Sequence, residues 1–258
     1  MFFFCKFHKM VFSSYPIFFG LSFLSFMGGM LMFMKFGFFY TLIFAIFYMT
    51  FISYLWLKDV MLEDMSGQYS FYDYRVFCQG FRLFILSEFI LFLTVFWCYF
   101  DYTMAPIFWL GGSYLPKGII SVSYLGLNAL ATSFLMMNSQ LVKYSRRMIC
   151  NNDDGCLTVV LICIFIGLGF ISFQLYEYSN LYYCICDSTF GSVFFLGTGL
   201  HGSHVFVGVW FLIFCYFRLV LLQFNWVHLQ MMDMSIDYWR FLEWMWGVMF
   251  SLLYIWGS

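Results

Sequence analysis

An acidic residue interrupts an apolar run in the stretch Leu83-Phe84-Ile85-Leu86-Ser87-Glu88-Phe89-Ile90-Leu91-Phe92-Leu93. The run predicts a membrane-spanning helix, in which a central carboxylate costs about 2.5–3.5 kcal/mol on insertion scales. Membrane proteins that keep such a group use it for an ion path, a proton, a partner helix or a lipid headgroup. Glu88 is therefore a candidate functional residue. The alternative is a protonated carboxyl group that hydrogen-bonds to a neighbouring helix.

The composition indicates that lipid surrounds most of the chain. Charged residues make up 10% of the 258 residues and hydrophobic residues 64%, whereas soluble domains have about 25% charged residues. So few ions cannot cover a water-exposed surface of this size. The net charge of −1 also excludes nucleic acid as a partner, because no basic field is available to hold phosphates.

Seven apolar runs have the length that a membrane span needs, which is about 20 residues. The runs predict an all-α membrane protein in which 1–258 form a single integral membrane domain. The sixth run is long enough to require tilting or an extension beyond the bilayer. No internal repeat is visible, which argues against an inverted-repeat transporter. The predicted spans are 14–34, 38–57, 79–100, 121–142, 157–178, 191–223 and 236–256.

Lysine and arginine are distributed unequally between the two sides of these spans. The side of the N-terminus has Lys6, Lys9, Lys58, Arg75, Lys143, Arg146 and Arg147, and the other side has Lys35 and Lys117. The positive-inside rule then places the N-terminus in the bacterial cytoplasm or the mitochondrial matrix, and Ser258 across the membrane. The first residues resemble neither a secretory signal nor a transit peptide, so we expect synthesis in the compartment of the membrane itself.

Two histidines, His201 and His204, lie on one face of the sixth span because they are three residues apart. A zinc site would need a further ligand, and the other histidines of the chain, His8 and His228, lie outside the apolar runs. Hydrogen bonding across helices or to a lipid headgroup is therefore favoured over metal or haem binding. The cysteines contain no CxxC pair, so zinc and iron–sulfur sites are not predicted from their spacing.

Other polar residues in or near the spans have structural or lipid-binding interpretations. Arg218 lies late in the sixth span, where it can reach the membrane surface or a phosphate. Arg240 and Glu243 are spaced for an ion pair on the last span. Thr198 and Gly202 have the spacing of small residues that let another helix approach. No nucleophile–base pair or phosphate-binding loop is present in the sequence, so an independent active site is not expected.

Several motifs together resemble subunit III of cytochrome c oxidase. The stretch 190–205, FGSVFFLGTGLHGSHV, is similar to that family's Y-G-S-x-F-F-x-x-T-G-F-H-G-x-H-V. Tyr238-Trp239-Arg240-Phe241 through Trp256-Gly257-Ser258 resembles its Y-W-H-F-V-D…W-G-S terminus, and Ser87-Glu88 resembles the end of its F-I-T-S-E. The similarity extends from about Leu55 to the end of the chain.

The resemblance implies seven helices in two bundles, helices 1–2 and helices 3–7, with phospholipids in a V-shaped cleft between the bundles. It implies no redox cofactor in this chain, since haem a and copper belong to partner subunits. Subunit I is the expected main partner, in a complex of the mitochondrial inner membrane that oxidises cytochrome c, reduces oxygen and pumps protons. The positions that correspond to the lipid-lined cleft are Trp56, Glu63, Glu88, Trp97, His201, His204 and Arg218.

The chain departs from the family pattern at several cationic positions. The family's Q-G-H-H-T is Ser66-Gly67-Gln68-Tyr69-Ser70, and the arginine of its W-W-R-D is Lys58. Cys78 stands where the family has an arginine before its third helix, and Arg82 follows one turn later. The histidine of Y-W-H-F is Arg240. We hypothesise that Lys58 and Arg82 partly replace the missing cations in the cleft.

Three other functions remain open from the sequence. The chain is also compatible with subunit III of a quinol oxidase, and with a bacterial inner membrane as its location. A stand-alone proton-coupled transporter would use Glu88 as its carrier, but such a protein is expected to have broken helices and paired charges near the midplane. A membrane haem enzyme is disfavoured by the small number of histidines, which is 4.

Overall fold

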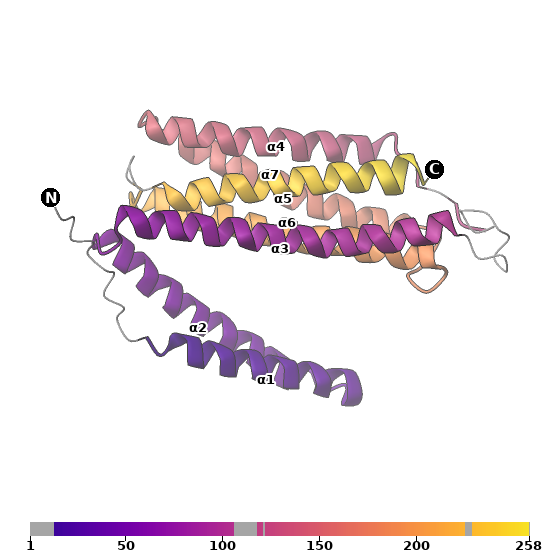
Figure 1. The fold of residues 1–258 in the computed structure, drawn as a ribbon, viewed down its shortest axis with the longest axis horizontal. Helices are drawn as coiled ribbons and strands as arrows, with labels where there is room; N and C mark the ends of the chain where they lie inside the picture. Colours follow the sequence, from indigo (N-terminus) through magenta and orange to yellow (C-terminus); the bar gives the residue numbers. More distant parts are fainter. Residues whose placement is uncertain (1–12, 106–117, 121, 225–228, 258) are drawn as a thin grey trace. The chain divides into compact units, whose positions relative to one another are not determined.

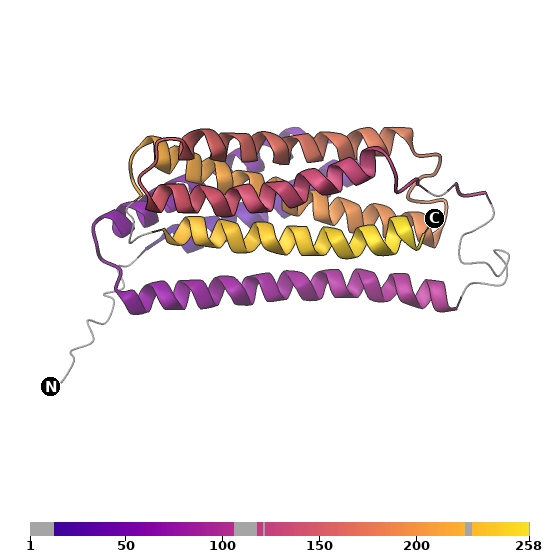
Figure 2. The same ribbon diagram turned by 90° about the horizontal axis from the view of Figure 1, so that it is seen from above.

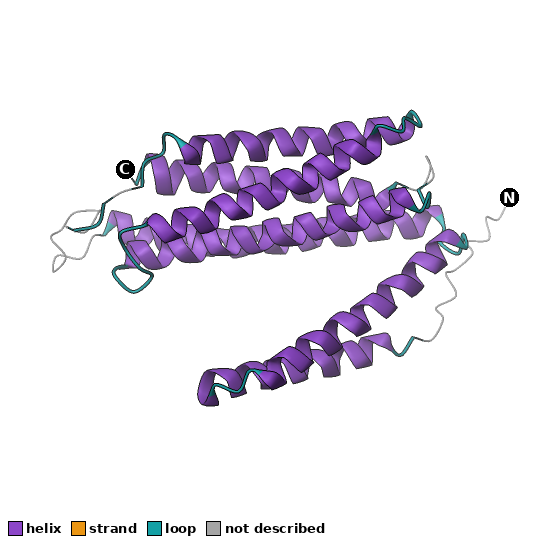
Figure 3. Cartoon of the chain, turned by 180° about the vertical axis from the view of Figure 1, so that it is seen from behind, coloured by secondary structure: helices purple, strands orange, loops and turns teal. Residues whose placement is uncertain are grey.

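The computed structural model describes residues 13–105, 118–120, 122–224 and 229–257, and in these residues every regular element is helical (Figure 3). The helices are α1 (Tyr15–Phe36), α2 (Tyr40–Met65), α3 (Phe71–Met104), α4 (Leu127–Cys150), α5 (Cys156–Asn180), α6 (Thr189–Val220), α7 (Gln230–Met249) and a terminal π-helix (Phe250–Ile255). The predicted all-α class is confirmed. Lys6, His8, Lys9, Lys117, His228 and Ser258, on which parts of the sequence analysis depend, lie outside the described residues.

Five of the helices, α1, α2, α3, α5 and α6, are long and apolar enough to cross a membrane. The helices α4 and α7 are more polar, since α4 contains Asn138 and Lys143 and α7 contains Asp233 and Asp237. Integral membrane character is therefore confirmed. The total of seven spans stays a prediction for α4 and α7.

The polar segment between the second and third predicted spans is mostly helical. The predicted spans 38–57 and 79–100 leave residues 58–78 as a connection, but α2 continues to Met65 and α3 begins at Phe71. Ser70 and Asp73 explain the early start of α3. The Asp73 carboxylate accepts hydrogen bonds from the Ser70 backbone N–H and hydroxyl, at 2.7 and 2.8 Å. This arrangement resembles a capping box, with Asp73 in the place of the usual Glu or Gln.

The chain divides into two compact units, Met1–Phe77 and Cys78–Ser258. In the first unit, α1 and α2 form an antiparallel hairpin (Figure 1). Gly37 ends α1 in the left-handed conformation, with φ of 72°, which glycine adopts without a steric penalty. At Gly29, a Cβ atom would lie 3.1 Å from the Leu42 backbone, so a small residue lets the two helices approach closely.

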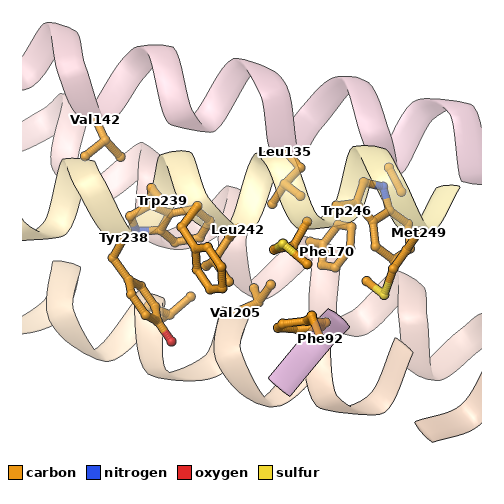
Figure 4. Close-up of a cluster of buried hydrophobic side chains, with 14 of the residues drawn as sticks. Phe92, Leu135, Val142, Phe170, Val205, Tyr238, Trp239, Leu242, Trp246 and Met249 are labelled. Carbon is orange, nitrogen blue, oxygen red and sulfur yellow. The ribbon is translucent and has the colours of Figure 1, made fainter. Parts of the chain in front are cut away.

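In the second unit, the helices lie side by side as a bundle from Cys78 onward (Figure 2). Trp239, Leu242 and Trp246 of α7 are buried at its centre, against Phe170 of α5 and Val205 of α6 (Figure 4). The polarity of α7 is compatible with this position, because the face that carries these aromatic and aliphatic residues is enclosed by other helices.

Glycines allow the bulky side chains of α7 to fit. At Gly167, a Cβ atom would lie 2.6 Å from Val209 Cγ2 and 3.1 Å from the Trp239 ring. At Gly208, it would lie 3.1 Å from Leu242. Gly202, which the sequence suggested as a close-approach position, has open space where a Cβ would lie. Among the described residues, no other helix of this chain therefore approaches Gly202 closely, and a helix contact there stays a prediction.

Candidate functional site

Glu88 has a partner on another helix. Its Oε2 atom lies 2.8 Å from Nε2 of His204, so the pair joins α3 to α6. The His204 side chain is 11% exposed and the Glu88 side chain 22% exposed. Both groups are thus mostly enclosed, and the Glu88 side chain remains partly accessible at the surface of the bundle. The sequence-based expectation that the histidines hydrogen-bond across helices is confirmed at this position.

The hydrogen bonds of His204 fix the number of protons in this pair. Nδ1 lies 2.7 Å from the Leu200 carbonyl oxygen, which can only accept, so Nδ1 carries a proton. One more proton must lie between Nε2 and Glu88, either on the imidazole or on the carboxyl group. Both arrangements have zero net charge. The pair therefore avoids the high free-energy cost of an isolated ion in hydrocarbon.

Aromatic rings enclose the inner side of the pair. The Phe92 ring centroid lies 5.3 Å from that of His204, and the Phe241 centroid lies 6.4 Å from it. Phe92 is fully buried. The pair therefore sits at the edge of the hydrophobic core, where its geometry is fixed on one side and accessible on the other.

His201 has a different environment from His204. It has no exposed surface, and its Nε2 donates to the Leu242 carbonyl oxygen of α7 at 3.2 Å. Its ring packs against Phe170 and Trp246, with centroids 5.6 and 5.0 Å away. The prediction that His201 contacts lipid is incompatible with this burial, so we assign it a role in packing α6 against α5 and α7.

Trp97 and Arg218 are the other predicted lipid contacts in the second unit. Trp97 is 77% exposed, as expected for a ring that faces lipid. Arg218 is only 7% exposed. Its guanidinium carbon lies 4.7 Å from the centre of the Phe224 ring, and Nη1 lies 3.8 Å from the Met231 sulfur. Arg218 can therefore offer only a small part of its surface to a lipid.

Arg82 lies apart from the Glu88–His204 pair. It lines a pocket between α3, α4 and α7 together with Lys143, Arg146 and Arg240. In this region the predicted pairing of Arg240 with Glu243 is wrong. The ion pair is formed with Asp237 instead, at 4.0 Å. A helix brings the residues three positions before and after Arg240 equally near, so spacing alone could not distinguish Asp237 from Glu243.

In the first unit, tyrosine hydroxyl groups donate hydrogen bonds to the carboxylates near the end of α2. Glu63, a predicted lipid contact, accepts a hydrogen bond from the Tyr69 hydroxyl at 2.8 Å. Two neighbouring pairs repeat this pattern, namely Tyr15 with Asp59 and Tyr74 with Asp64, each at 2.7 Å. The phenol groups satisfy these acids where the sequence lacks the histidines of the resembled motif.

Two further predicted contacts belong to this unit. Trp56 is half-buried, and its ring lies edge-on to Phe19 with the centroids 6.0 Å apart. Lys58 is exposed. Tyr69 itself is partly enclosed, and its burial together with the nearby Glu63 carboxylate raises its pKa to about 12. The Tyr69 hydroxyl therefore remains a hydrogen-bond donor across the physiological pH range.

Two polar contacts in the second unit were not anticipated. The Glu177 carboxylate accepts from the Tyr254 hydroxyl at 2.8 Å and from the Gln174 amide at 3.0 Å. Arg146 forms an ion pair with Asp233 that joins α4 to α7. Glu177 lies near the end of the predicted span 157–178, where a residue at the membrane interface is expected. Its i, i+3 spacing from Gln174 was the available signal of a network.

The structure and its polar groups define an integral membrane protein of packed helices in which the mostly enclosed Glu88 and His204 pair with one another across two helices. In the described part of the chain, no three His, Cys, Asp or Glu residues are grouped so that they could hold a metal ion. A family model described as "Cytochrome c oxidase subunit III" matches residues 5–258. The chain belongs to this family.

Relatives named "Cytochrome c oxidase subunit 3" come from distant eukaryotes. The protein of the tick Rhipicephalus sanguineus is 31% identical over 255 residues, which cover 98% of this chain and 99% of the relative. The protein of Candida glabrata is 34% identical and covers 83% of this chain and 80% of its own length. The protein of Drosophila melanogaster is 32% identical over a region that covers 80% of this chain and 79% of the relative.

Proposed function

We propose that the chain is a non-catalytic core subunit of cytochrome c oxidase in the mitochondrial inner membrane. In this role it packs on subunit I and supports electron transfer from cytochrome c to oxygen and the coupled proton pumping. Haem a and copper are held by the partner subunits. The N-terminus faces the matrix and the C-terminus the intermembrane space, in agreement with the distribution of lysine and arginine.

The observation that carries the proposal is the closed Glu88–His204 pair. A carrier must exchange its proton or ion with water on both sides of the membrane, and transporters commonly do this at broken helices. Here the carboxylate is held 2.8 Å from an imidazole that is itself fixed by the Leu200 carbonyl oxygen. Both groups lie on uninterrupted helices. This geometry favours a static link between helices over a transport site.

We further propose that phospholipid binds beside this pair, in a cleft between the helix pair 1–2 and the bundle 3–7. The accessible part of the Glu88 side chain, the 77% exposed ring of Trp97 and the accessible part of Arg218 supply polar and aromatic groups for a headgroup and its glycerol region. Trp56, Lys58 and Glu63 are the proposed contacts from the first unit.

Purification of the tagged chain in mild detergent tests the proposal. We expect it to co-purify with a larger partner that shows haem a absorbance in the reduced-minus-oxidised spectrum and that oxidises cytochrome c. A complex that oxidises quinol but not cytochrome c would indicate the quinol oxidase alternative. An isolated colourless chain that moves protons in vesicles would refute the proposal and support a transporter.

A further inference from the structure

A pocket with a volume of about 360 Å³ lies between α3, α4 and α7 of the second unit. Its cations are Arg82 from α3, Lys143 and Arg146 from α4, and Arg240 from α7. Its acids are Asp233 and Asp237. The pocket thus has a net charge of +2 in a chain whose net charge is −1.

The two acids do not neutralise the pocket. Arg146 is paired with Asp233, and Arg240 lies 4.0 Å from Asp237. In the described part of the chain, no carboxylate lies within ion-pairing distance of Arg82 or Lys143, and both side chains are exposed. The pocket therefore contains two cations that form no ion pair among the described residues, although Glu243 lines an adjacent pocket together with Lys143 and Arg240.

These cations lie near the ends of their predicted membrane spans. Arg82 and Arg240 are three and four residues inside the starts of the spans 79–100 and 236–256, and Lys143 directly follows the span 121–142. Apolar side chains line the same pocket, namely Phe81, Met234 and Ile236. Clustered cations at the level of the membrane surface attract anionic groups.

We propose that this pocket binds a phosphate-bearing anion. A phosphate group matches the net charge of +2, and its several oxygens can accept hydrogen bonds from cations on three helices at once. Arginine is well suited to such contacts because its planar guanidinium group binds phosphate through two N–H groups. Arg240 stands where the resembled motif has a histidine, and Arg82 follows one turn after Cys78, which replaces an arginine of the resembled pattern.

This site is separate from the proposed lipid cleft. The pocket shares no residue with the Glu88–His204 pair. An experiment can therefore refute this proposal without refuting the proposed lipid cleft, and the reverse. Its phosphate could be the headgroup of an anionic phospholipid or free phosphate from the aqueous phase. The chemistry of recognition is the same, and the experiment distinguishes the two sources.

The test uses the purified complex that contains this chain, stripped of loosely bound lipid in mild detergent. Phosphatidylglycerol is titrated and bound copies are counted by native mass spectrometry, with zwitterionic phosphatidylcholine for comparison. Radiolabelled inorganic phosphate is measured in parallel by equilibrium dialysis. The test variants are Arg82→Gln combined with Arg240→Gln, and separately Lys143→Gln. Arg147→Gln is the matched control, because Arg147 is an exposed cation of α4 that does not line the pocket.

We expect the double variant to bind phosphatidylglycerol about tenfold more weakly or worse, since each cation near a membrane surface contributes about 1 kcal/mol to binding an anionic lipid. Lys143→Gln should show a smaller loss, and Arg147→Gln none. The same dependence for inorganic phosphate would identify free phosphate as the ligand. The proposal is overturned if neither probe distinguishes the variants from the wild type. It is also overturned if the variants lose a protein subunit while their binding of both probes is unchanged.

Discussion

Nε2 of His204 lies 2.8 Å from Oε2 of Glu88 and thereby joins α6 to α3 across 116 residues of sequence. The Leu200 carbonyl oxygen holds the other ring nitrogen, so the imidazole cannot turn away without losing two hydrogen bonds. Glu88 and His204 are therefore best understood as a single neutral unit. Variants that change one member test the unit as a whole.

Glu88→Gln should be tolerated, whereas Glu88→Ala should not. A glutamine amide can donate to Nε2 of neutral His204, so the link between helices is kept. Alanine leaves the imidazole without its partner, which should cost about 1–2 kcal/mol. The measurement is the thermal release of this subunit from the purified complex. Ser87→Ala is the control, because its hydroxyl bonds only to the Phe84 carbonyl of its own helix. Equal losses in both Glu88 variants would contradict the assignment.

For Glu88→Gln we also expect reduced phospholipid retention with assembly preserved.

Gly167→Ala should weaken the packing of α5 against α6 and α7. The added methyl group would lie 2.6 Å from Val209 Cγ2 and 3.1 Å from the Trp239 ring, and neither stiff side chain can move aside easily. Overpacking of this kind costs about 1–3 kcal/mol. Gly169→Ala is the matched control two positions away, where no atom lies within 4 Å. It should be neutral or slightly stabilising, because alanine favours helix. Thermal unfolding of the two variants side by side measures the difference.

Tyr254→Phe should destabilise the end of the second unit. Tyr254 is fully buried, and its hydroxyl donates to Glu177 at 2.8 Å. Without this donor, the carboxylate loses one of its hydrogen bonds and keeps that of the Gln174 amide, at a cost of about 1–3 kcal/mol. Tyr176→Phe on α5, next to Glu177, is the control, and since Tyr176 is 58% exposed, this variant should change the midpoint temperature little. A comparable shift in both variants would show that the loss is not specific to Glu177.

Tyr69→Phe should remove a tyrosine that titrates near pH 12. Because the folded-state pKa is raised from 10.0 to about 12, the stability that the neutral phenol contributes is complete below pH 10 and is lost as the pH rises through 12. The absorbance of the wild type and of this variant is measured as a function of pH. The difference between the two titration curves should show one tyrosinate that forms near pH 12. Tyr72→Phe controls for removal of a nearby phenol and should leave the Tyr69 transition in place. A Tyr69 transition near pH 10 would refute the contact with Glu63.

The existence of the helices could be predicted because their apolar runs are long, but their ends could not. The segment around Ser70 is polar, and polarity alone suggests a loop. Helix continues on both sides of this short turn, and at the start of α3 Asp73 satisfies the exposed backbone N–H of Ser70. The thickness of the membrane limits the length of an apolar run, whereas capping and hydrogen bonding decide how far a helix extends into water.

Glu88 could be identified from its isolation in an apolar run, but its partner could not be deduced, since pairing with His204 depends on how α3 packs on α6. The two histidines show a related limit. Three residues along a helix correspond to about 300° of rotation, so the rings of His201 and His204 point about 60° apart. That difference places one ring inside the core and the other at its edge, which the shared motif does not reveal.

The fixed protonation of His204 at Nδ1 has a consequence for the response of this subunit to the membrane potential. Moving one elementary charge across the whole membrane is worth about 2.3 kcal/mol per 100 mV. A proton that shifts within the Glu88–His204 contact travels less than 2.8 Å, which is under about a tenth of a hydrocarbon thickness of about 30 Å. Energisation of the membrane would therefore bias its position by at most about 0.2 kcal/mol per 100 mV. The link between α3 and α6 should hold equally well in resting and respiring membranes.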